Sequence, residues 1–178
     1  MTLRSRSGSL VAPIAVLAVV TSACSSELPG RAVPQAAAIK SCTQPADVFR
    51  NLKACDLLEP TTTAKGFDPT AEETYESDNR CGTRKHGFGA VPLYLVPEAG
   101  IDQLSPGQGT KIPTKVGERE AVEIPGDAGT QACTVAIAVT PNARMTASTS
   151  LNKGTNEEAC ALSREIAEAA EPKLPRGN

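Results

Sequence analysis

Six cysteines are the feature that most limits how this chain can fold. The chain contains no tryptophan, and aromatic residues make up only 3% of it, so its core must be built from Ala, Val, Leu and Ile. A core of such small side chains is thin, and small domains with thin cores are commonly reinforced by disulfide bonds. The first question is therefore which of the cysteines pair with one another.

The first cysteine, Cys24, follows a segment that is typical of export. A basic start precedes an apolar run from Leu10 to Ala23. This run is shorter than the roughly 20 residues that span a bilayer and is typical of a signal peptide. The small residues 21–23 directly before the cysteine resemble the bacterial lipobox, in which the cysteine thiol is acylated and the signal is removed. Thr21 departs from that motif, because an aliphatic residue usually stands there.

We therefore expect Cys24 to carry a lipid anchor; plain secretion and a retained membrane segment are the alternatives. Each buried methylene of an acyl chain contributes about 0.8 kcal/mol, and two chains hold a protein at a membrane more firmly than one. The sequence predicts a lipoprotein signal peptide over residues 1–23 and an anchor with a flexible tether over residues 24–44. A single disulfide-stabilised domain is expected over residues 45–178, on the extracytoplasmic face of the cell membrane.

The other five cysteines are Cys42, Cys55, Cys81, Cys133 and Cys160. An odd number in an oxidising compartment predicts two disulfide bonds and one free thiol. No pair has Cys-x-x-Cys spacing and the chain has one histidine, so neither a zinc site nor a thioredoxin-like redox pair is expected. The net charge of −2, with no basic cluster, argues against nucleic-acid binding.

Hydrophobic periodicity predicts an α+β fold. Residues 45–60 place apolar side chains at helical spacing, with Pro60 interrupting, and residues 156–171 form a longer amphipathic helix. Thr155 or Asn156 can cap this second helix, and Pro172 stops it.

Between the helices, strands are expected over residues 90–96, 118–124, 133–139 and 144–151, with a further strand in residues 81–87. The strands at residues 133–139 and 144–151 should form a hairpin. Residues 68–79 should be an exposed acidic loop. We expect an antiparallel sheet of about four to five strands, covered on one face by a short N-terminal and a longer C-terminal helix.

Five sequence motifs occur in order: "CDLLEP", Cys81, "VGEREAVEI", "CTVAIAV" and "CALSREIAEAAEPKLP". Together they resemble a family of small actinobacterial lipoproteins, of the mycobacterial type, that share a domain of unknown function. The resemblance covers about Cys55 to Pro175, together with the lipobox. Members often carry a tryptophan shortly after the second cysteine, where this chain has Gly82 and Thr83. The resemblance implies a cell-envelope location and no catalytic residue.

The cysteines that match this family are Cys55, Cys81, Cys133 and Cys160, which leaves Cys42 as the free thiol. Four cysteines allow three connectivities. If the predicted hairpin returns through Leu151, the following helix starts at the same end of the sheet as Cys133. This direction favours Cys133–Cys160, and with it Cys55–Cys81. The pairing of Cys55 with Cys160 and of Cys81 with Cys133 stays open if both helices start side by side.

The polar residues of the chain match no catalytic pattern. His86 lies in "RKHGFG" near no nucleophile that the sequence locates, and we expect it in an exposed loop. The "GFGA" that follows lacks the spacing of a phosphate loop and is expected to allow a bend. The acidic residues of the predicted loop lack the pattern of a calcium loop; they are Glu72, Glu73, Glu76 and Asp78.

Two classes of function are consistent with these observations. The first is a non-enzymatic binding module that holds a partner protein or a small apolar ligand in the cell envelope. The second is an envelope enzyme, similar to a hydrolase, whose site is assembled from scattered residues. The absence of a catalytic motif favours the binding module. We expect the membrane to be its partner through the lipid, and we expect no cofactor or metal. A cleft with converging polar groups would favour an enzyme, and a dry tunnel would favour a lipid carrier.

Overall fold

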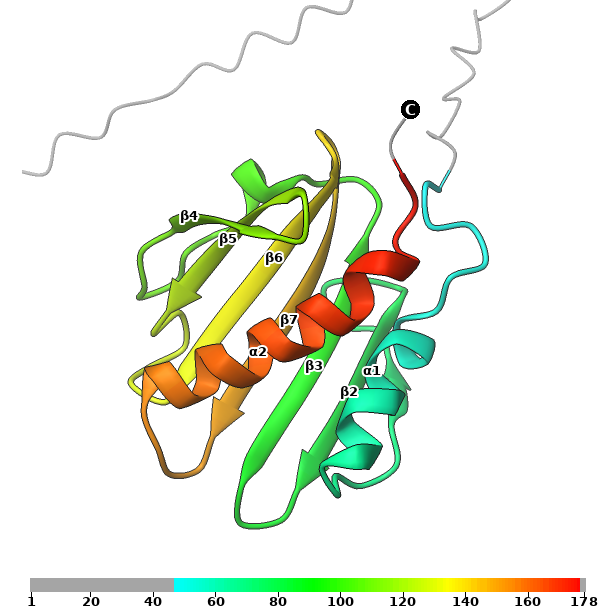
Figure 1. Ribbon diagram of the computed structural model, residues 1–178. Helices are drawn as coiled ribbons and strands as arrows, with labels where there is room; N and C mark the ends of the chain where they lie inside the picture. Colours follow the sequence, from blue (N-terminus) through cyan, green and yellow to red (C-terminus); the bar gives the residue numbers. More distant parts are fainter. Residues whose placement is uncertain (1–46, 177–178) are drawn as a thin grey trace, which may run out of the picture. The chain divides into compact units, whose positions relative to one another are not determined.

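The computed structural model describes residues 47–176, in which a seven-stranded antiparallel sheet carries two α-helices on one face (Figure 1). The predicted signal peptide and tether, including Cys24 and Cys42, lie outside the described residues. The elements in chain order are α1 (Ala54–Ala64), β1 (Ala71–Glu73), β2 (Arg80–Lys85), β3 (Gly89–Val96), the 3-10 turn η1 (Ile101–Gln103), β4 (Ile112–Val116), β5 (Arg119–Pro125), β6 (Ala132–Thr140), β7 (Ala143–Leu151), α2 (Asn156–Ala170) and the 3-10 turn η2 (Glu171–Lys173).

The strands lie in the order β1-β2-β3-β7-β6-β5-β4. Two meanders, β1–β3 and β4–β7, meet where β3 pairs with β7, with Leu93 opposite Ala147. The long connection from β3 to β4 runs along the face that carries no helix. Arg144 holds it there, because Nη1 of this residue donates to the carbonyl oxygens of Ala99 and Gly100 at 3.0 and 3.1 Å. Helix α1 packs on β2 and β3, and α2 packs on β5, β6 and β7.

The expectation of four to five strands is wrong, because the sheet has seven. The two strands that were not expected, β1 and β4, form the two edges of the sheet. Most of the β4 residues are exposed, and β1 lies inside the segment that was expected to be a loop. These edges form by backbone pairing with β2 and β5 and bury few side chains, so they leave no alternating pattern in the sequence.

Helix α1 also differs from its prediction, because it begins at Ala54 and continues through Pro60. Its start is set from a distance: the Asn79 side chain accepts from the Ala54 N–H at 2.9 Å and donates to the Leu52 carbonyl at 2.8 Å. Pro60 lacks the N–H that would bond to the Asp56 carbonyl four residues earlier. That carbonyl accepts instead from Lys173 Nζ at 3.4 Å.

Two disulfide bonds join the helices to the sheet, so the prediction of a disulfide-stabilised domain is confirmed. Cys55–Cys81 connects α1 to β2, and Cys133–Cys160 connects β6 to α2, with Cα separations of 5.0 and 4.9 Å. The alternative pairing that the sequence left open is not the one present. Ser163 on α2 reinforces the second junction, because its hydroxyl donates to the Cys133 carbonyl at 3.0 Å.

Candidate functional site

A groove is lined by residues from the end of α1, the β2–β3 turn, the end of β7 and the first half of α2. Figure 1 shows α1 and α2 on the same face of the sheet. We call this groove the Phe–Lys groove. Its volume is about 560 Å³, within the usual range for small-molecule sites. The residues that line it are Lys65, Phe67, Lys85, Phe88, Leu151, Lys153, Glu158, Ala161, Leu162 and Glu165. It therefore combines an apolar floor with a rim of charged side chains.

The end of α1 places Phe67 in the groove. Gly66 adopts a φ of 70°, and its N–H bonds to the Thr63 carbonyl at 3.0 Å. The Phe67 N–H bonds to the Thr62 carbonyl, also at 3.0 Å. This is the hydrogen-bond pattern of a Schellman motif, in which glycine supplies the left-handed residue and the next residue turns back onto the helix. Phe67 is consequently buried, with 9% of its surface exposed.

Gly66→Ala should lower the free energy of unfolding by about 1 kcal/mol, because an L side chain is strained at this positive φ. Chemical denaturation of the purified protein measures the change. The matched control is Thr63→Ala, an exposed position on the same helix, which should change stability by no more than about 0.5 kcal/mol. A Gly66→Ala protein as stable as the parent would show that this glycine does not set the end of α1.

The β2–β3 turn brings Phe88 to the other side of the groove. Lys85 pairs with Gly89, and Gly87 between them has a φ of 73°. The turn is fixed to the end of β7, because the Asn152 N–H donates to the Phe88 carbonyl at 2.8 Å. The predicted bend at "GFGA" is thus a hairpin turn. Phe88 is 39% exposed, and its ring meets Phe67 edge to face with centroids 5.6 Å apart.

Lys85 places its ammonium beside both aromatic rings. Its Nζ is 5.9 Å from the Phe67 centroid and 5.8 Å from the Phe88 centroid, within the range of cation–π attraction. The same Nζ donates to the Lys65 carbonyl at 2.7 Å, at the C-terminal end of α1. The Lys65 ammonium is 2.8 Å from a Glu165 carboxylate oxygen. A cation is thus held in place beside the two phenylalanine rings of the groove.

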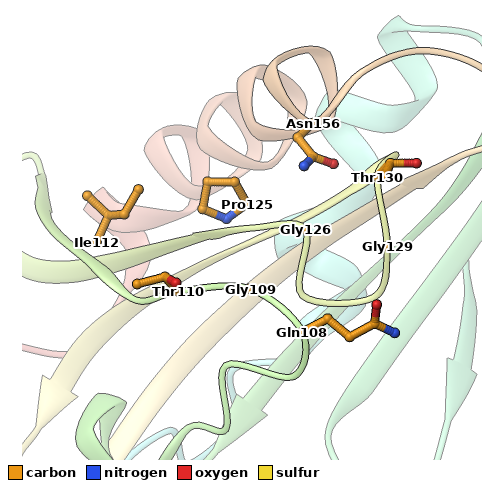
Figure 2. A pocket seen from close by; sticks show the side chains of 9 residues that line it. All are labelled: Gln108, Gly109, Thr110, Ile112, Pro125, Gly126, Gly129, Thr130 and Asn156. Carbon is orange, nitrogen blue, oxygen red and sulfur yellow. The ribbon is translucent and has the colours of Figure 1, made fainter.

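A second hollow, of about 490 Å³, lies between the β3–β4 connection, the β5–β6 loop and the N-terminus of α2 (Figure 2). Small and uncharged residues line most of it, among them Gly109, Gly126 and Thr130. The Asn156 Oδ1 atom has no hydrogen-bond partner among the described residues. This hollow offers a ligand neither a counter-charge nor a continuous apolar wall, so the Phe–Lys groove is the stronger candidate.

The acidic residues of the predicted loop are dispersed. Glu73 on β1 pairs with Arg80 at 2.8 Å, whereas Glu76 and Asp78 line a wide polar hollow of about 850 Å³ beside Arg50 and other charged residues of both signs. Within residues 47–176, no group of three or more His, Cys, Asp or Glu side chains is arranged to hold a metal ion. His86 is exposed in the β2–β3 turn.

Arg80 is the centre of a side-chain cluster on the helix-free face of the sheet. The sequence analysis did not predict this cluster. Its guanidinium lies 4.8 Å from the Tyr94 centroid and 5.4 Å from that of Tyr75. Burial raises the pKa of Tyr94 to about 12, although the charge of Arg80 opposes the shift. The charge of this arginine is already met by Glu73 and by two rings, so the cluster is a structural one.

A chain of polar side chains on the same face ends at a carboxylate. The Thr134 hydroxyl donates to Asp127 Oδ2 at 2.6 Å and lies 2.6 Å from Ser148 Oγ. Because a hydroxyl has one hydrogen to donate, Ser148 is the donor to Thr134. In the part of the chain that is described, no hydrogen bond joins Ser148 to an imidazole or an amine. This arrangement orients the hydroxyls but supplies no general base at the serine.

Comparison with protein-family models, with curated proteins and with solved structures gave no match. The resemblance to actinobacterial lipoproteins therefore stays a prediction. Over residues 47–176, neither helix has the length and apolar character needed to cross a bilayer.

The sequence contains one signal for the groove that lies outside the motifs described above. Two of the three phenylalanines, Phe67 and Phe88, directly follow a glycine and have a lysine within three positions before them. A large apolar residue that follows a turn glycine lies where a helix or strand ends, close to the surface of the protein. This pattern does not predict that the two turns lie next to each other.

Proposed function

We propose that this protein is a lipoprotein anchored through Cys24 at the extracytoplasmic face of the cell membrane, and that its domain is a non-enzymatic binding module for a small ligand with an apolar body. The anchor is supported by the short apolar run and the small residues before Cys24. The binding site is the Phe–Lys groove, and the exposed Phe88 ring beside a held ammonium is the observation that carries this proposal.

The composition of the groove supports binding over catalysis. Its floor is made by Phe67, Leu151 and Leu162, each of which keeps less than a tenth of its surface exposed and presents it to the groove. Its polar lining consists of lysines and glutamates, and no hydroxyl, thiol or imidazole is among these lining residues. The larger space between the helices and the sheet is filled by core side chains, so a ligand would lie in a surface groove and not in a tunnel.

Cys24→Ala should release the protein from the membrane fraction or leave its signal uncut, because the thiol is the acylated group. Fractionation followed by mass spectrometry of the N-terminal peptide measures both results. The control is Cys42→Ala, which removes a cysteine from the predicted tether and should leave the protein membrane-bound. A Cys24→Ala protein that is processed and retained like the parent would contradict the anchor.

The groove is tested with a photoreactive apolar probe. The lipidated protein in phosphatidylcholine vesicles is irradiated with a diazirine derivative of dodecanol, and the labelled peptides are identified by mass spectrometry. We expect labelling on peptides that contain Phe88 or Leu162, reduced by about twofold to tenfold in Phe88→Ala, since an aromatic contact contributes roughly 0.5–1.5 kcal/mol.

The matched control is Ile112→Ala, which removes another exposed large apolar side chain outside the groove, at 48% exposure. This variant should be labelled like the parent. Labelling spread evenly over the exposed peptides, or equal loss in both variants, would contradict a binding site in the groove.

A further inference from the structure

The charges of the Phe–Lys groove are not balanced. Among residues 47–176, three lysines and two glutamates line it, so these side chains leave one positive charge in excess. Glu165 is engaged by Lys65, and Glu158 accepts from the Thr155 N–H at 2.9 Å as part of the cap of α2. Among the described residues, neither Lys85 nor Lys153 forms a salt bridge with a carboxylate. The positive charge is thus available to a ligand.

Lys85 is the lysine best placed to meet an anionic group. The residue is half-buried, and its ammonium already donates one hydrogen bond, to the Lys65 carbonyl, which leaves two N–H groups. The two phenylalanine rings lie together on one side of it and limit the access of water from that side. A carboxylate can accept both remaining bonds, and such charge-assisted bonds are about twice as strong as neutral ones.

We infer that the groove selects a single-chain amphiphile with a carboxylate head group, of the fatty-acid class, whose chain lies on Phe67, Leu151 and Leu162 and whose head group binds Lys85. This inference rests on the proposed function of the groove. A monoanion fits better than a phosphate dianion, because Glu158 and Glu165 on the rim repel a second negative charge. The volume of about 560 Å³ suits one hydrocarbon chain and not the two of a membrane phospholipid.

A purely structural role for Lys85 makes a different prediction. Its ammonium lies at the negative end of the α1 dipole, where a cation stabilises the helix. If this were its whole role, its removal would lower stability and leave the choice of ligand head group unchanged. The preference among head groups is therefore the quantity that separates the two roles.

The experiment measures competition against the photoreactive dodecanol in the same vesicles. Dodecanoate, dodecanol and dodecyltrimethylammonium are the competitors, each corrected for its measured partition into the lipid. In the parent protein, dodecanoate should compete at about a tenfold lower concentration than dodecanol, and the ammonium compound should compete less well than dodecanol.

Lys85→Met keeps the length and apolar stem of the side chain and removes its charge, so the tenfold preference for dodecanoate should be lost. Lys85→Arg should retain it, and Lys115→Met, an exposed lysine on β4, is the control that should not change it. Should Lys85→Met fail to fold, the comparison of the three head groups on the parent protein decides the question.

Equal competition by the three head groups, or an unchanged preference in folded Lys85→Met, would overturn the carboxylate inference while the groove still binds apolar ligands. The absence of any labelling in the groove of the parent would overturn the proposed function itself. The two failures are therefore distinguishable.

Discussion

Replacing Cys133 and Cys160 together by alanine should lower the free energy of unfolding by about 3–4 kcal/mol, because the variant lacks the disulfide bond between them. The bond closes a loop with a sequence separation of 27, and removing it restores that loop's conformational freedom to the unfolded chain. Both cysteines are buried, at 0% and 4% exposure, in a small cluster with Leu151 and Ala159. Chemical denaturation under non-reducing conditions measures the loss.

The second disulfide supplies the matched comparison. Cys55–Cys81 closes a loop with a separation of 26, so the chain-entropy model predicts a loss of nearly equal size for its double alanine variant. A loss below about 1 kcal/mol for either pair would contradict this account. Peptide mapping without reduction provides an independent check, because a crosslinked peptide that joins Cys81 to Cys133 would contradict the observed pairing.

Ile166→Ala should destabilise the protein by about 2–5 kcal/mol, because it opens a cavity in the main core between α2 and the sheet. Ile166 is fully buried, at 0% exposure, and belongs to the same cluster as Leu58 of α1 and Ile137 of β6. A core of this composition has few large side chains that can move to refill the space.

Glu168→Ala is the control for this substitution. The residue lies on the exposed side of the same helix, and its replacement should change stability by no more than about 0.5 kcal/mol. Thermal unfolding of both variants, followed by circular dichroism, provides the comparison. Similar melting temperatures for the two variants would show that the main core does not depend on this contact.

Elements that bury a continuous apolar face could be predicted from the sequence. In β6, Cys133, Val135 and Ile137 lie on one face of the sheet and are buried there, as the period of two in the sequence indicates. The small residues Thr134 and Ala136 on the other face are buried as well. The turn at Pro141 joins β6 to β7 as expected, with Thr140 opposite Ala143. Helix α2 follows the same logic, because its apolar spacing and the capping box of Thr155 and Glu158 are both local properties of the chain.

The edges of the sheet and the start of α1 could not be predicted in this way. β4 contains Pro113 and has four exposed residues, so nothing in its side chains distinguishes it from a loop. It is a strand because β5 offers it backbone partners, with Thr114 opposite Ala121. Likewise, α1 begins at Ala54 because Asn79, 25 residues away, accepts from its N–H, and no periodicity reports such a contact.

The sequence alone determined the α+β class and the presence of two disulfide bonds among the cysteines, because these depend on residue type and on local periodicity. The tertiary structure decided which cysteines pair, since each bond joins a helix to a strand 26 or 27 residues away. The tertiary structure decided that Phe67 and Phe88 meet. Gly66 sends the chain from α1 back toward the sheet, where the Asp68 N–H bonds to the Arg84 carbonyl at 2.8 Å. Pairing of β2 with β3 then sets the second turn beside it, with Lys85 opposite Gly89. A site built from two turns 21 residues apart exists only after both are packed on the same sheet. The first turn supplies the Phe67 ring and the Lys65 carbonyl, and the second supplies the Phe88 ring and the Lys85 ammonium that this carbonyl holds.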